Sequence, residues 1–292
     1  MKRWLALACV FCLLTGCACA DDIWTREEWE AVVDALESDE TEPVPESRRV
    51  AFRSSWLPAK EMGFVNMLLI SSDAPDIEKN YGRASAILVC RINLLTGNMR
   101  LLSLPDDAMV KLAELPEAVP LRYVNCFGGA GLTARCVNDA LGLRVSRFCA
   151  VNIEAFIEIV DALGGVVMEL TEEEAQALDL EQGKQRLTGE QALQYVKMRL
   201  PGDGSRRVRG LLSAVLRQTL ESGSVKQMLL LWDLLLPAVD TNVTTDDLLE
   251  LVFGLFSVTA SASVEALGVT AESGSLDDTV KAQCRKFLYG EE

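Results

Sequence analysis

The chain has 292 residues, of which 49% are hydrophobic, and its formal net charge is −15 at pH 7. This composition is typical of a globular protein, and the acidic balance argues against a general nucleic-acid binder, which needs a basic surface to contact phosphates. The sequence contains no histidine, which excludes Ser-His-Asp and Cys-His catalysis and metal sites that depend on imidazole.

The N-terminus has the pattern of an export signal. A basic start is followed by an apolar run from Leu5 to Leu14, too short to span a membrane comfortably, and then by small residues. Leu14-Thr-Gly-Cys17 is similar to the bacterial lipobox, in which the cysteine becomes the lipidated first residue, while cleavage after Ala18-Cys-Ala20 is the alternative. Both predict that residues 1–20 are a signal peptide and that the chain is exported. Lipidation of Cys17 would hold it at a membrane surface.

The cysteines beyond this signal show no C-x-x-C spacing, which argues against zinc ribbons and thioredoxin-like chemistry. They are Cys19, Cys90, Cys126, Cys136, Cys149 and Cys284. Export permits disulfides, and Cys126 with Cys136 is one candidate pair. Burial as small apolar residues is the alternative, and it is at least as well supported for Cys90 and Cys149, which lie in strand-like runs.

Residues 21–60 are expected to form a polar lead-in with one short helix, Arg26–Leu36, and a charged linker that contains proline. The core then begins with an apolar strand at Val65–Ile70. A hairpin of strands at Ala86–Asn93 and Met99–Leu104 follows, joined by a Thr-Gly-Asn turn.

Three charged side chains fall at or near the ends of these strands, where sheets usually present groups that handle ligands. They are Asp73, Arg83 and Asp107.

Helices and strands alternate in the rest of the chain. We expect a loop at Gly128-Gly129, then a helix Leu132–Leu141 ended by Gly142 and a strand Arg147–Val151. A helix Ile153–Leu163, capped by Asn152, and a strand Val166–Leu170 follow. Later come helices Val225–Leu236 and Asp246–Phe256 and a tail with a small strand pair and a helix from Leu276. This order, with an inserted hairpin, predicts an α/β/α sandwich with a mixed central sheet. The run Met228–Leu236 is apolar on nearly every side, which fits either a deeply buried helix or the wall of a tunnel for a lipid chain.

The stretch from Tyr195 to Arg209 joins two helices through a Pro-Gly break. Thr188 and Gln191 form a helix-start box before it, and Asp203 or Ser205 suits the N-cap of the helix after it. Arg206 and Arg209 share one face of that second helix, close to an N-terminus that already favours anions. Two guanidiniums there predict a phosphate or pyrophosphate site. A solvated, ion-paired helix face is the alternative.

Several motifs between Gly63 and Phe256 follow one another in the order of a known family. They are Ile-Ser-Ser-Asp73, Arg83 with the hairpin after it, Ser103-Leu-Pro-Asp106-Asp107, the Gly-Gly loop, Val151–Val166, Leu187–Arg199 and Gly-Asp203-x-x-Arg206-x-x-Arg209. With them the chain resembles the LytR-CpsA-Psr family, envelope proteins of mainly Gram-positive bacteria that transfer glycopolymers from a polyprenyl-pyrophosphate carrier to peptidoglycan.

The chain departs from the family at several site positions. Pro75 replaces the family's arginine after Ser-Asp, Ser85 replaces the aspartate of Arg-x-Asp, and Asp106 replaces the arginine of Pro-Arg-Asp. Pro120 stands at the position of the lysine before the Gly-Gly loop, with Arg122 as a substitute, and Gly210 replaces the final glutamine.

The resemblance implies an LCP-like domain over residues 61–258 with an apolar pocket for a polyprenyl chain, and a C-terminal extension, 259–292, packed on it. It assigns catalysis to Asp73, Arg83, Arg206 and Arg209. It assigns pyrophosphate binding to Arg83, Arg122, Arg199, Arg206 and Arg209, and a Mg²⁺ or Mn²⁺ ion to Asp73, Asp107 and Asp203. Asp73 would bind that ion or deprotonate the attacking sugar hydroxyl.

The function implied is transfer of a teichoic acid or capsule type of polymer, with a polyprenyl-pyrophosphate-linked glycan, peptidoglycan and a membrane surface as partners and no nucleic acid. Its place would be the outer face of the cytoplasmic membrane or the cell wall, with a lipid anchor. The alternative is a non-catalytic relative that binds polyprenyl-phosphate lipid or a wall-assembly partner. The substitutions Pro75, Ser85 and Asp106 favour this alternative.

Overall fold

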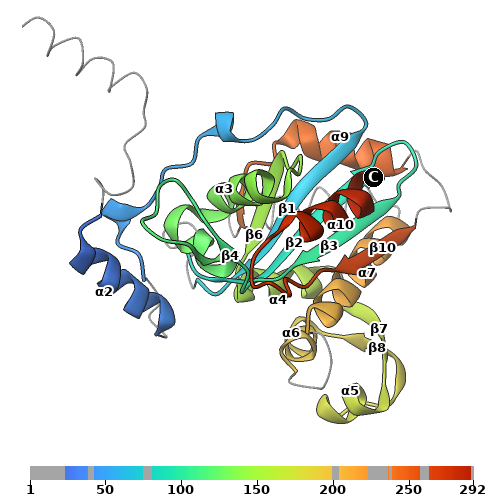
Figure 1. Cartoon of the computed structure of the whole chain (residues 1–292). Coiled ribbons are helices and arrows are strands. Elements are labelled where there is room, and N and C mark those ends of the chain that lie inside the picture. The colour runs from blue at the N-terminus through green and yellow to red at the C-terminus, as the bar shows by residue number, and fades with distance from the viewer. Residues whose placement is uncertain are drawn as a thin grey trace, which may run out of the picture.

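A mixed six-stranded sheet forms the centre of the protein (Figure 1). The computed structural model describes residues 24–38, 43–74, 81–198, 204–222, 236, 239–256 and 263–290. The strand order is β10-β3-β2-β1-β6-β9. The strands are β1 (Phe64–Ser72), β2 (Ala84–Asn93), β3 (Met99–Leu104), β6 (Arg147–Val151), β9 (Val239–Thr241) and β10 (Val264–Gly268). The strand β1 is antiparallel to β2 and parallel to β6, which confirms the predicted mixed sheet.

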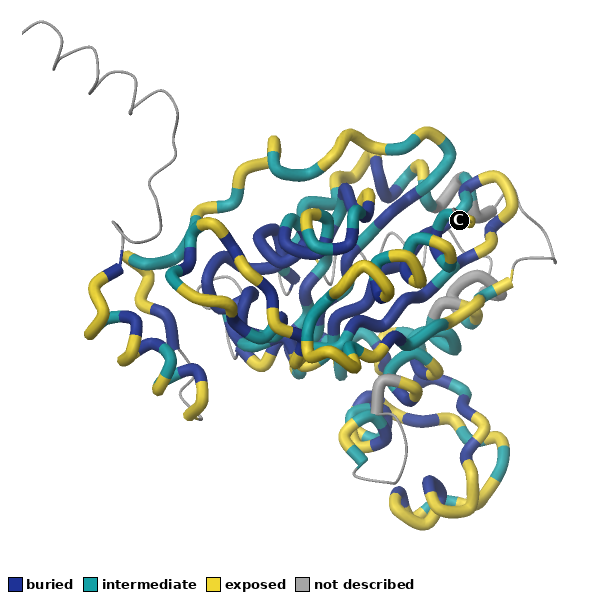
Figure 2. Tube along the Cα trace, in the orientation of Figure 1, coloured by how far each residue is buried: buried dark blue, intermediate teal, exposed yellow. Residues whose placement is uncertain are grey.

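Each face of the sheet is covered by its own layer of helices, because successive side chains of a strand point to opposite faces. Leu68 and Ile70 belong to the main core, together with side chains of α3 (Leu121–Leu141) and α10 (Asp278–Tyr289). Val65 and its neighbours on the other face pack with α7 (Gly204–Ser222) and α9 (Thr245–Phe256). In Figure 2 dark blue marks much of the central strands β1, β2 and β3 and much of α3, which lie in the core.

The predicted break at Gly128-Gly129 is confirmed, because both glycines have non-helical backbone angles and divide α3 into two helical halves. The first half, which begins at Leu121, was not predicted from the sequence. Gly129 has φ 66° and ψ −168°, and a Cβ there would lie 2.8 Å from the ring of Tyr81. The two glycines therefore interrupt the helix at a close tertiary contact that a side chain would block.

The lead-in helix α2 (Arg26–Glu37) packs on the sheet domain. Its capping box joins Thr25 and Glu28, and its buried residues are Trp29, Val32 and Leu36. Trp29 stacks on Phe127 of α3 with ring centroids 6.0 Å apart. The chain then passes through two 3-10 turns, η2 (Glu46–Arg48) and η3 (Ser54–Trp56), before it enters β1.

A smaller unit with its own core projects below the sheet in Figure 1. It consists of α4 (Ile153–Ala162), the hairpin β7 (Val166–Leu170) and β8 (Gly183–Leu187), α5 (Glu172–Ala177) and α6 (Gly189–Lys197). The predicted cap of α4 by Asn152 and the helix-start box of Thr188 and Gln191 are both confirmed. The elements α5 and β8 were not predicted from the sequence. The short pair β4 (Met109–Val110) and β5 (Val119–Pro120) was not predicted either.

The tail joins the sheet instead of pairing with itself. Its strand β10 adds to the edge of the sheet, parallel to β3, and α10 packs into the main core. The predicted helix Val225–Leu236 lies outside the described residues except for Leu236. No helix in the described part of the chain combines the length and the apolar character needed to cross a membrane.

The candidate disulfide between Cys126 and Cys136 is wrong. Both thiols are free, buried, and carried by the same helix, α3. Burial raises the pKa of both thiols to about 12, as it does for Cys90, Cys149 and Cys284.

Candidate functional site

Asp73 and Arg83 meet at the end of the sheet, whereas Arg206 and Arg209, the other two residues of the predicted catalytic set, lie on α7. The Arg83 backbone N–H donates to Oδ1 of Asp73 at 2.5 Å, and Nη1 of Arg83 lies 3.2 Å from Oδ2. The Asp73 N–H donates in return to the Arg83 carbonyl at 3.1 Å. Gly82 makes this approach possible, because a Cβ there would lie 2.3 Å from Oδ1 of Asp73. The chain therefore builds a fixed acid–arginine pair where β1 ends and β2 begins.

The rest of the Arg83 guanidinium binds the C-terminal end of α2. Nε donates to the Leu36 carbonyl at 3.2 Å, and Nη2 donates to the carbonyls of Ala35, at 3.3 Å, and Ser38. Terminal carbonyls of a helix attract cations, since they lack helical partners and lie at the negative end of the dipole. With the Asp73 contact, all three guanidinium nitrogens of Arg83 are engaged by protein atoms.

A second polar group lies under the kink of α3. Asp240 of β9 accepts the N–H of Ala130, and desolvation by burial nevertheless raises its carboxyl pKa. A Cβ on Gly129 would lie 3.1 Å from Oδ2 of Asp240, and the guanidinium of Arg49 lies 5.6 Å from the ring centroid of Tyr81. The sequence analysis missed this carboxylate. The available signal was an aspartate directly before Thr241-Asn242, in a short strand.

The amide of Asn125 links α3 to the Asp73–Arg83 turn. Its Nδ2 donates to the Gly82 carbonyl at 2.7 Å, and its Oδ1 is buried without a hydrogen-bond partner within the described part of the protein. The first half of α3, which the sequence analysis assigned to no element, therefore supports the turn that presents Arg83.

The predicted arginines lie on α7, which covers the face of the sheet opposite to α3. Arg206 is exposed in the first turns, and Arg209 lies against β10, where a Cβ on Gly268 would be 2.2 Å from its Nη1. Gly268 pairs with Ser103 of β3, which places Arg209 over the sheet. The proposal of Ser205 as N-cap is wrong, because Ser205 lies inside α7.

Arg207, between those two arginines, is buried and was not selected from the sequence. Its Nη2 donates to the Met198 carbonyl at the end of α6. The predicted site residues Arg199 and Asp203 follow Met198 and lie outside the described residues, as does Cys17. Arg207 thus ties α7 to the last described residue before that connection.

The remaining predicted residues lie near the same end of the sheet. The Arg122 N–H donates to the Asp106 carbonyl at 2.7 Å, and its guanidinium lies 4.7 Å from the ring centroid of Tyr123. Asp107 is exposed in the turn after β3. Ser85, at the family's aspartate position, donates to the Ser71 carbonyl at 3.2 Å. In the described part of the chain, no three Cys, Asp or Glu side chains gather as a metal cage would require.

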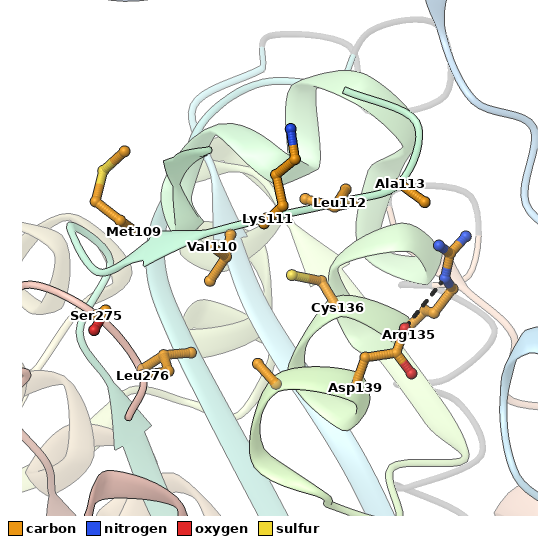
Figure 3. A pocket seen from close by; sticks show the side chains of 11 residues that line it. Met109, Val110, Lys111, Leu112, Ala113, Arg135, Cys136, Asp139, Ser275 and Leu276 are labelled. Carbon is orange, nitrogen blue, oxygen red and sulfur yellow. Dashed lines mark hydrogen bonds and ion pairs between the residues drawn. The ribbon is translucent and has the colours of Figure 1, made fainter. Parts of the chain in front are cut away.

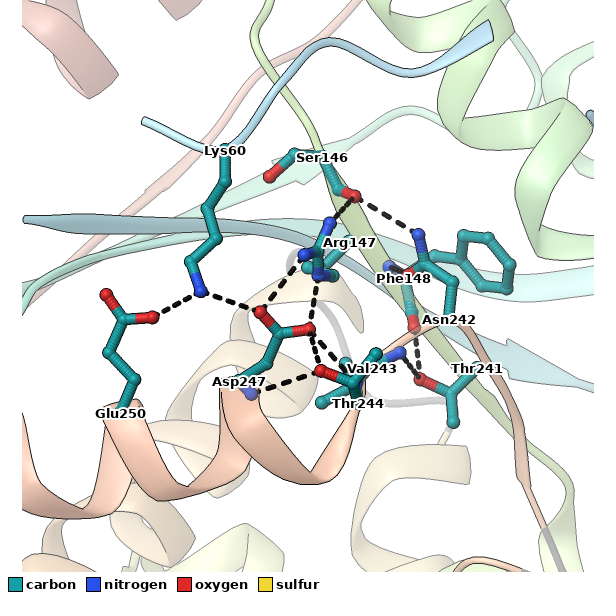
Figure 4. A network of polar contacts seen from close by, with 10 residues as sticks. All are labelled: Lys60, Ser146, Arg147, Phe148, Thr241, Asn242, Val243, Thr244, Asp247 and Glu250. Atoms are coloured by element: carbon teal, nitrogen blue, oxygen red, sulfur yellow. Dashed lines mark hydrogen bonds and ion pairs between the residues drawn. The ribbon is translucent and has the colours of Figure 1, made fainter. Parts of the chain in front are cut away.

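A buried ion network fixes α9 over the sheet (Figure 4). Arg147 of β6 contacts both carboxylate oxygens of Asp247, at 2.7 and 3.0 Å, and Lys60 binds Asp247 at 2.8 Å. Burial raises the pKa of Asp247, but hydrogen bonds from Arg147, Lys60 and Thr244 outweigh it and hold the pKa well below its usual range. The helix that covers Val65 and Met67 is thereby fixed at its N-terminus.

A cavity of about 360 Å³ opens between β4, the second half of α3 and the segment before α10 (Figure 3). Its cations are already paired, since Arg135 binds Glu114 at 2.6 Å and Lys111 donates to the Leu115 carbonyl at 2.9 Å. None of the predicted site residues lines it. It is therefore separate from the candidate site.

A mixed sheet between two helical layers, with an acid–arginine pair at one end and arginines on a covering helix, defines an α/β/α protein with a candidate anion site. The sequence profile of the LytR_cpsA_psr family matches residues 30–286. The chain belongs to this family.

Curated relatives are transferases by name. The polyisoprenyl-teichoic acid–peptidoglycan teichoic acid transferase TagU of Oceanobacillus iheyensis is 29% identical over 233 residues, which cover 75% of this chain and 70% of TagU. TagU of Halalkalibacterium halodurans is 28% identical over 204 residues, covering 68% of this chain and 66% of that protein.

Solved structures confirm the fold. TagT bound to LI-WTA has a TM-score of 0.64 at 22% identity, covering 82% of this chain and 99% of that one. TagT (YwtF) with bound octaprenyl pyrophosphate lipid has a TM-score of 0.62 at 21% identity, with the same coverage.

Proposed function

We propose that this protein transfers an anionic glycopolymer of the teichoic acid or capsule type from a polyprenyl-pyrophosphate carrier to peptidoglycan. The observation that carries the proposal is the family match over residues 30–286 combined with Arg206 and Arg209 on α7. The relatives named as teichoic acid transferases, and TagT structures with bound WTA and with octaprenyl pyrophosphate, support the same substrate class.

In the proposed complex the pyrophosphate binds the arginines of α7, because guanidiniums match phosphate oxygens and neutralise charge in the transition state. Arg122 and Arg199 would add to this cationic group. The prenyl chain would occupy the apolar layer between the sheet and α7 and α9, where Met67, Leu69 and Leu251 are only partly buried.

The transfer step breaks the phosphoanhydride bond of the donor and forms a phosphodiester bond to the acceptor. An acceptor sugar hydroxyl attacks the phosphorus that bears the glycopolymer, the P–O bond to polyprenyl phosphate breaks, and polyprenyl phosphate leaves. The hydroxyl proton passes to a carboxylate, for which Asp73 is the candidate. Arg83 would then act mainly by holding Asp73, since most of its donors already bind protein atoms.

The proposal includes a Mg²⁺ or Mn²⁺ ion, which would be bound mainly by oxygens of the pyrophosphate. Asp73, Asp107 and Asp203 are its candidate ligands. The described carboxylates form no preformed cage, and both oxygens of Asp73 already accept N–H groups of Arg83. The ion would therefore arrive with its phosphate ligands.

The second candidate is a non-catalytic relative that binds polyprenyl-phosphate lipid or a wall-assembly partner. The engagement of Arg83 by α2 favours it, as do Pro75, Ser85 and Asp106 at family site positions. Asp106 adds a negative charge where the family has a cation.

Export, a signal peptide at residues 1–20, lipidation at Cys17 and residence at the outer face of the cytoplasmic membrane or in the cell wall complete the proposal. The envelope substrates of the relatives support this location.

The test is cleavage of a short synthetic polyprenyl-pyrophosphate glycan by the complete protein with Mg²⁺, beside Arg206→Ala. Polyprenyl phosphate released by the wild type and lost in the variant supports the transferase. Lipid binding without turnover in the wild type would instead establish the non-catalytic relative.

A further inference from the structure

Two large apolar side chains project into solvent at one end of the protein. Met62 is 95% exposed and Leu95 is 80% exposed, far more than the other large apolar residues of the described chain. Met62 precedes β1, and Leu95 lies in the turn between β2 and β3. These two segments are adjacent, because Phe64 pairs with Asn93 and the Leu94 N–H donates to the Gly63 carbonyl at 2.9 Å. We name this end the apolar tip.

Hydrogen bonds within the turn fix the backbone that carries Leu95. Oδ1 of Asn93 accepts the N–H groups of Leu95, at 2.9 Å, and Thr96, at 3.1 Å, and the Gly97 N–H donates to the Asn93 carbonyl at 2.8 Å. The turn is thus closed by its own side chain, as Asx turns are. Leu95 is 80% exposed at a position that these hydrogen bonds fix in the turn.

Charges beside the apolar tip are paired within the protein. Glu61 binds Arg91 at 2.7 Å, and Lys60 binds Asp247 and Glu250. The last described residues of α9, 251–256, contain no charged residue. The net charge of the chain is −15, so an anionic membrane surface would repel most of the protein. The apolar tip, whose neighbouring charges are paired, is suited to contact such a surface.

The apolar tip continues the apolar layer beneath α7 and α9. Leu94, next to Leu95, belongs to the buried cluster of Val65, Cys90 and Met99. A Cβ on Gly254 of α9 would lie 3.0 Å from Cβ of Leu94, so α9 ends against this turn. The Asp73–Arg83 pair lies at the other end of the same strands.

We propose that the apolar tip inserts into the acyl region of a bilayer, at the end where the isoprenoid chain leaves the membrane for the layer beneath α7 and α9. The route of the isoprenoid chain rests on the proposed function, but insertion of the apolar tip does not. Two protruding side chains on convex turns suit a bilayer better than a protein partner, because a specific protein interface buries about 1,000 Å² or more.

Insertion is measured by the environment of a label at the apolar tip. We would introduce Leu95→Cys, or Met109→Cys as the matched control at a 41% exposed methionine elsewhere, into the complete chain with Cys9, Cys12 and Cys19 changed to serine. Four of the five described native thiols are buried, Cys149 is partly buried, and the pKa of each is raised to about 12, so an environment-sensitive fluorophore labels the new site.

The labelled proteins are placed in phosphatidylglycerol-containing nanodiscs that carry nitroxide lipids at several depths. The expected result is a blue-shifted emission at residue 95, quenched most by nitroxides within the acyl region, and a water-like emission at residue 109. Equal quenching at both positions, or none at residue 95, would overturn the proposal. A lipid-free dimer that buries the label at residue 95 would overturn it in favour of self-association.

A paired kinetic test uses Met62→Asp with Leu95→Asp, beside Met109→Asp. Burial of each apolar side chain contributes on the order of tenfold in partitioning, so the double variant should require at least tenfold more of a substrate embedded in vesicles. A short-chain substrate in detergent should be used at an unchanged rate. Loss of both activities, or of neither, contradicts the proposal. The nanodisc measurement needs no substrate, so it stands if the transferase itself fails.

Discussion

The contact between Arg83 and α2 makes the sharpest prediction about how this site is assembled. Arg83→Gln removes the charge and the donors that bind the carbonyls of Ala35, Leu36 and Ser38. The Arg83 side chain is only 18% exposed, so solvent replaces these contacts poorly. A hydrogen bond to a charged group contributes about 1.5–3 kcal/mol.

With three such contacts, partly offset by water when α2 opens, we expect opening of α2 to become easier by about 3 kcal/mol. That corresponds to roughly 150-fold faster exchange of its amides. Hydrogen-exchange mass spectrometry of peptides within residues 26–37 measures this directly. Arg26→Gln is the matched control, because Arg26 is 90% exposed and its pair with Glu30 contributes at most about 0.5 kcal/mol.

Equal protection of α2 in the two variants would refute the assignment of Arg83 as the anchor of α2. The same measurement on the wild type bears on mechanism. A pyrophosphate that binds through Arg83 must displace the α2 carbonyls, so the lipid would raise exchange in α2. If Arg83 acts through Asp73, the lipid leaves α2 protected.

Two further predictions concern charge. Hydrogen bonds from Arg91 are the largest cause that lowers the pKa of Glu61, from 4.5 to about 2, so this pair stabilises the fold above pH 4.5 and loses its effect as pH falls toward 2. Urea unfolding of Arg91→Met should show a loss of about 3 kcal/mol at pH 7 that narrows to about 1 kcal/mol at pH 3, whereas an equal loss at both pH values would exclude this linkage. Asp106→Arg should tighten binding of polyprenyl pyrophosphate by roughly tenfold, since it replaces a repulsive charge by an attractive one. Isothermal titration calorimetry measures this affinity, and Glu158→Arg on α4 is the control, for which we expect no increase. An equal increase in affinity in the two variants would show that only the net charge of the protein matters.

Much of the sheet could be predicted because its signals are local. The strands β1, β2, β3 and β6 are apolar runs bounded by turn residues, and the caps at Asn152 and Thr188 lie within three residues of the N–H groups they accept. Local signals failed at the first half of α3, from Leu121 to Phe127, which was not predicted as a helix. The pair Gly128-Gly129 did indicate the break in α3, and the close approach of Tyr81 and Asp240 explains why glycine is needed there.

The candidate site, too, could be predicted only where its signals are local. The ends of neighbouring strands predicted that Asp73 and Arg83 would lie together, and helical spacing placed Arg206 and Arg209 on one face. The engagement of Arg83 by α2 had no comparable signal, because its acceptors are backbone carbonyls of residues 45 to 48 positions away. Asp240 was missed for a related reason, since its significance comes from burial under a distant helix.

The location of a bound short-chain polyprenyl pyrophosphate, determined by crystallography of the complete protein, tests the central claim most directly. The account predicts that the pyrophosphate contacts Arg206 and Arg209 and that the prenyl chain lies between the sheet and the helices α7 and α9. A lipid bound in the cavity beside Arg135, or on the α3 face of the sheet, would contradict it.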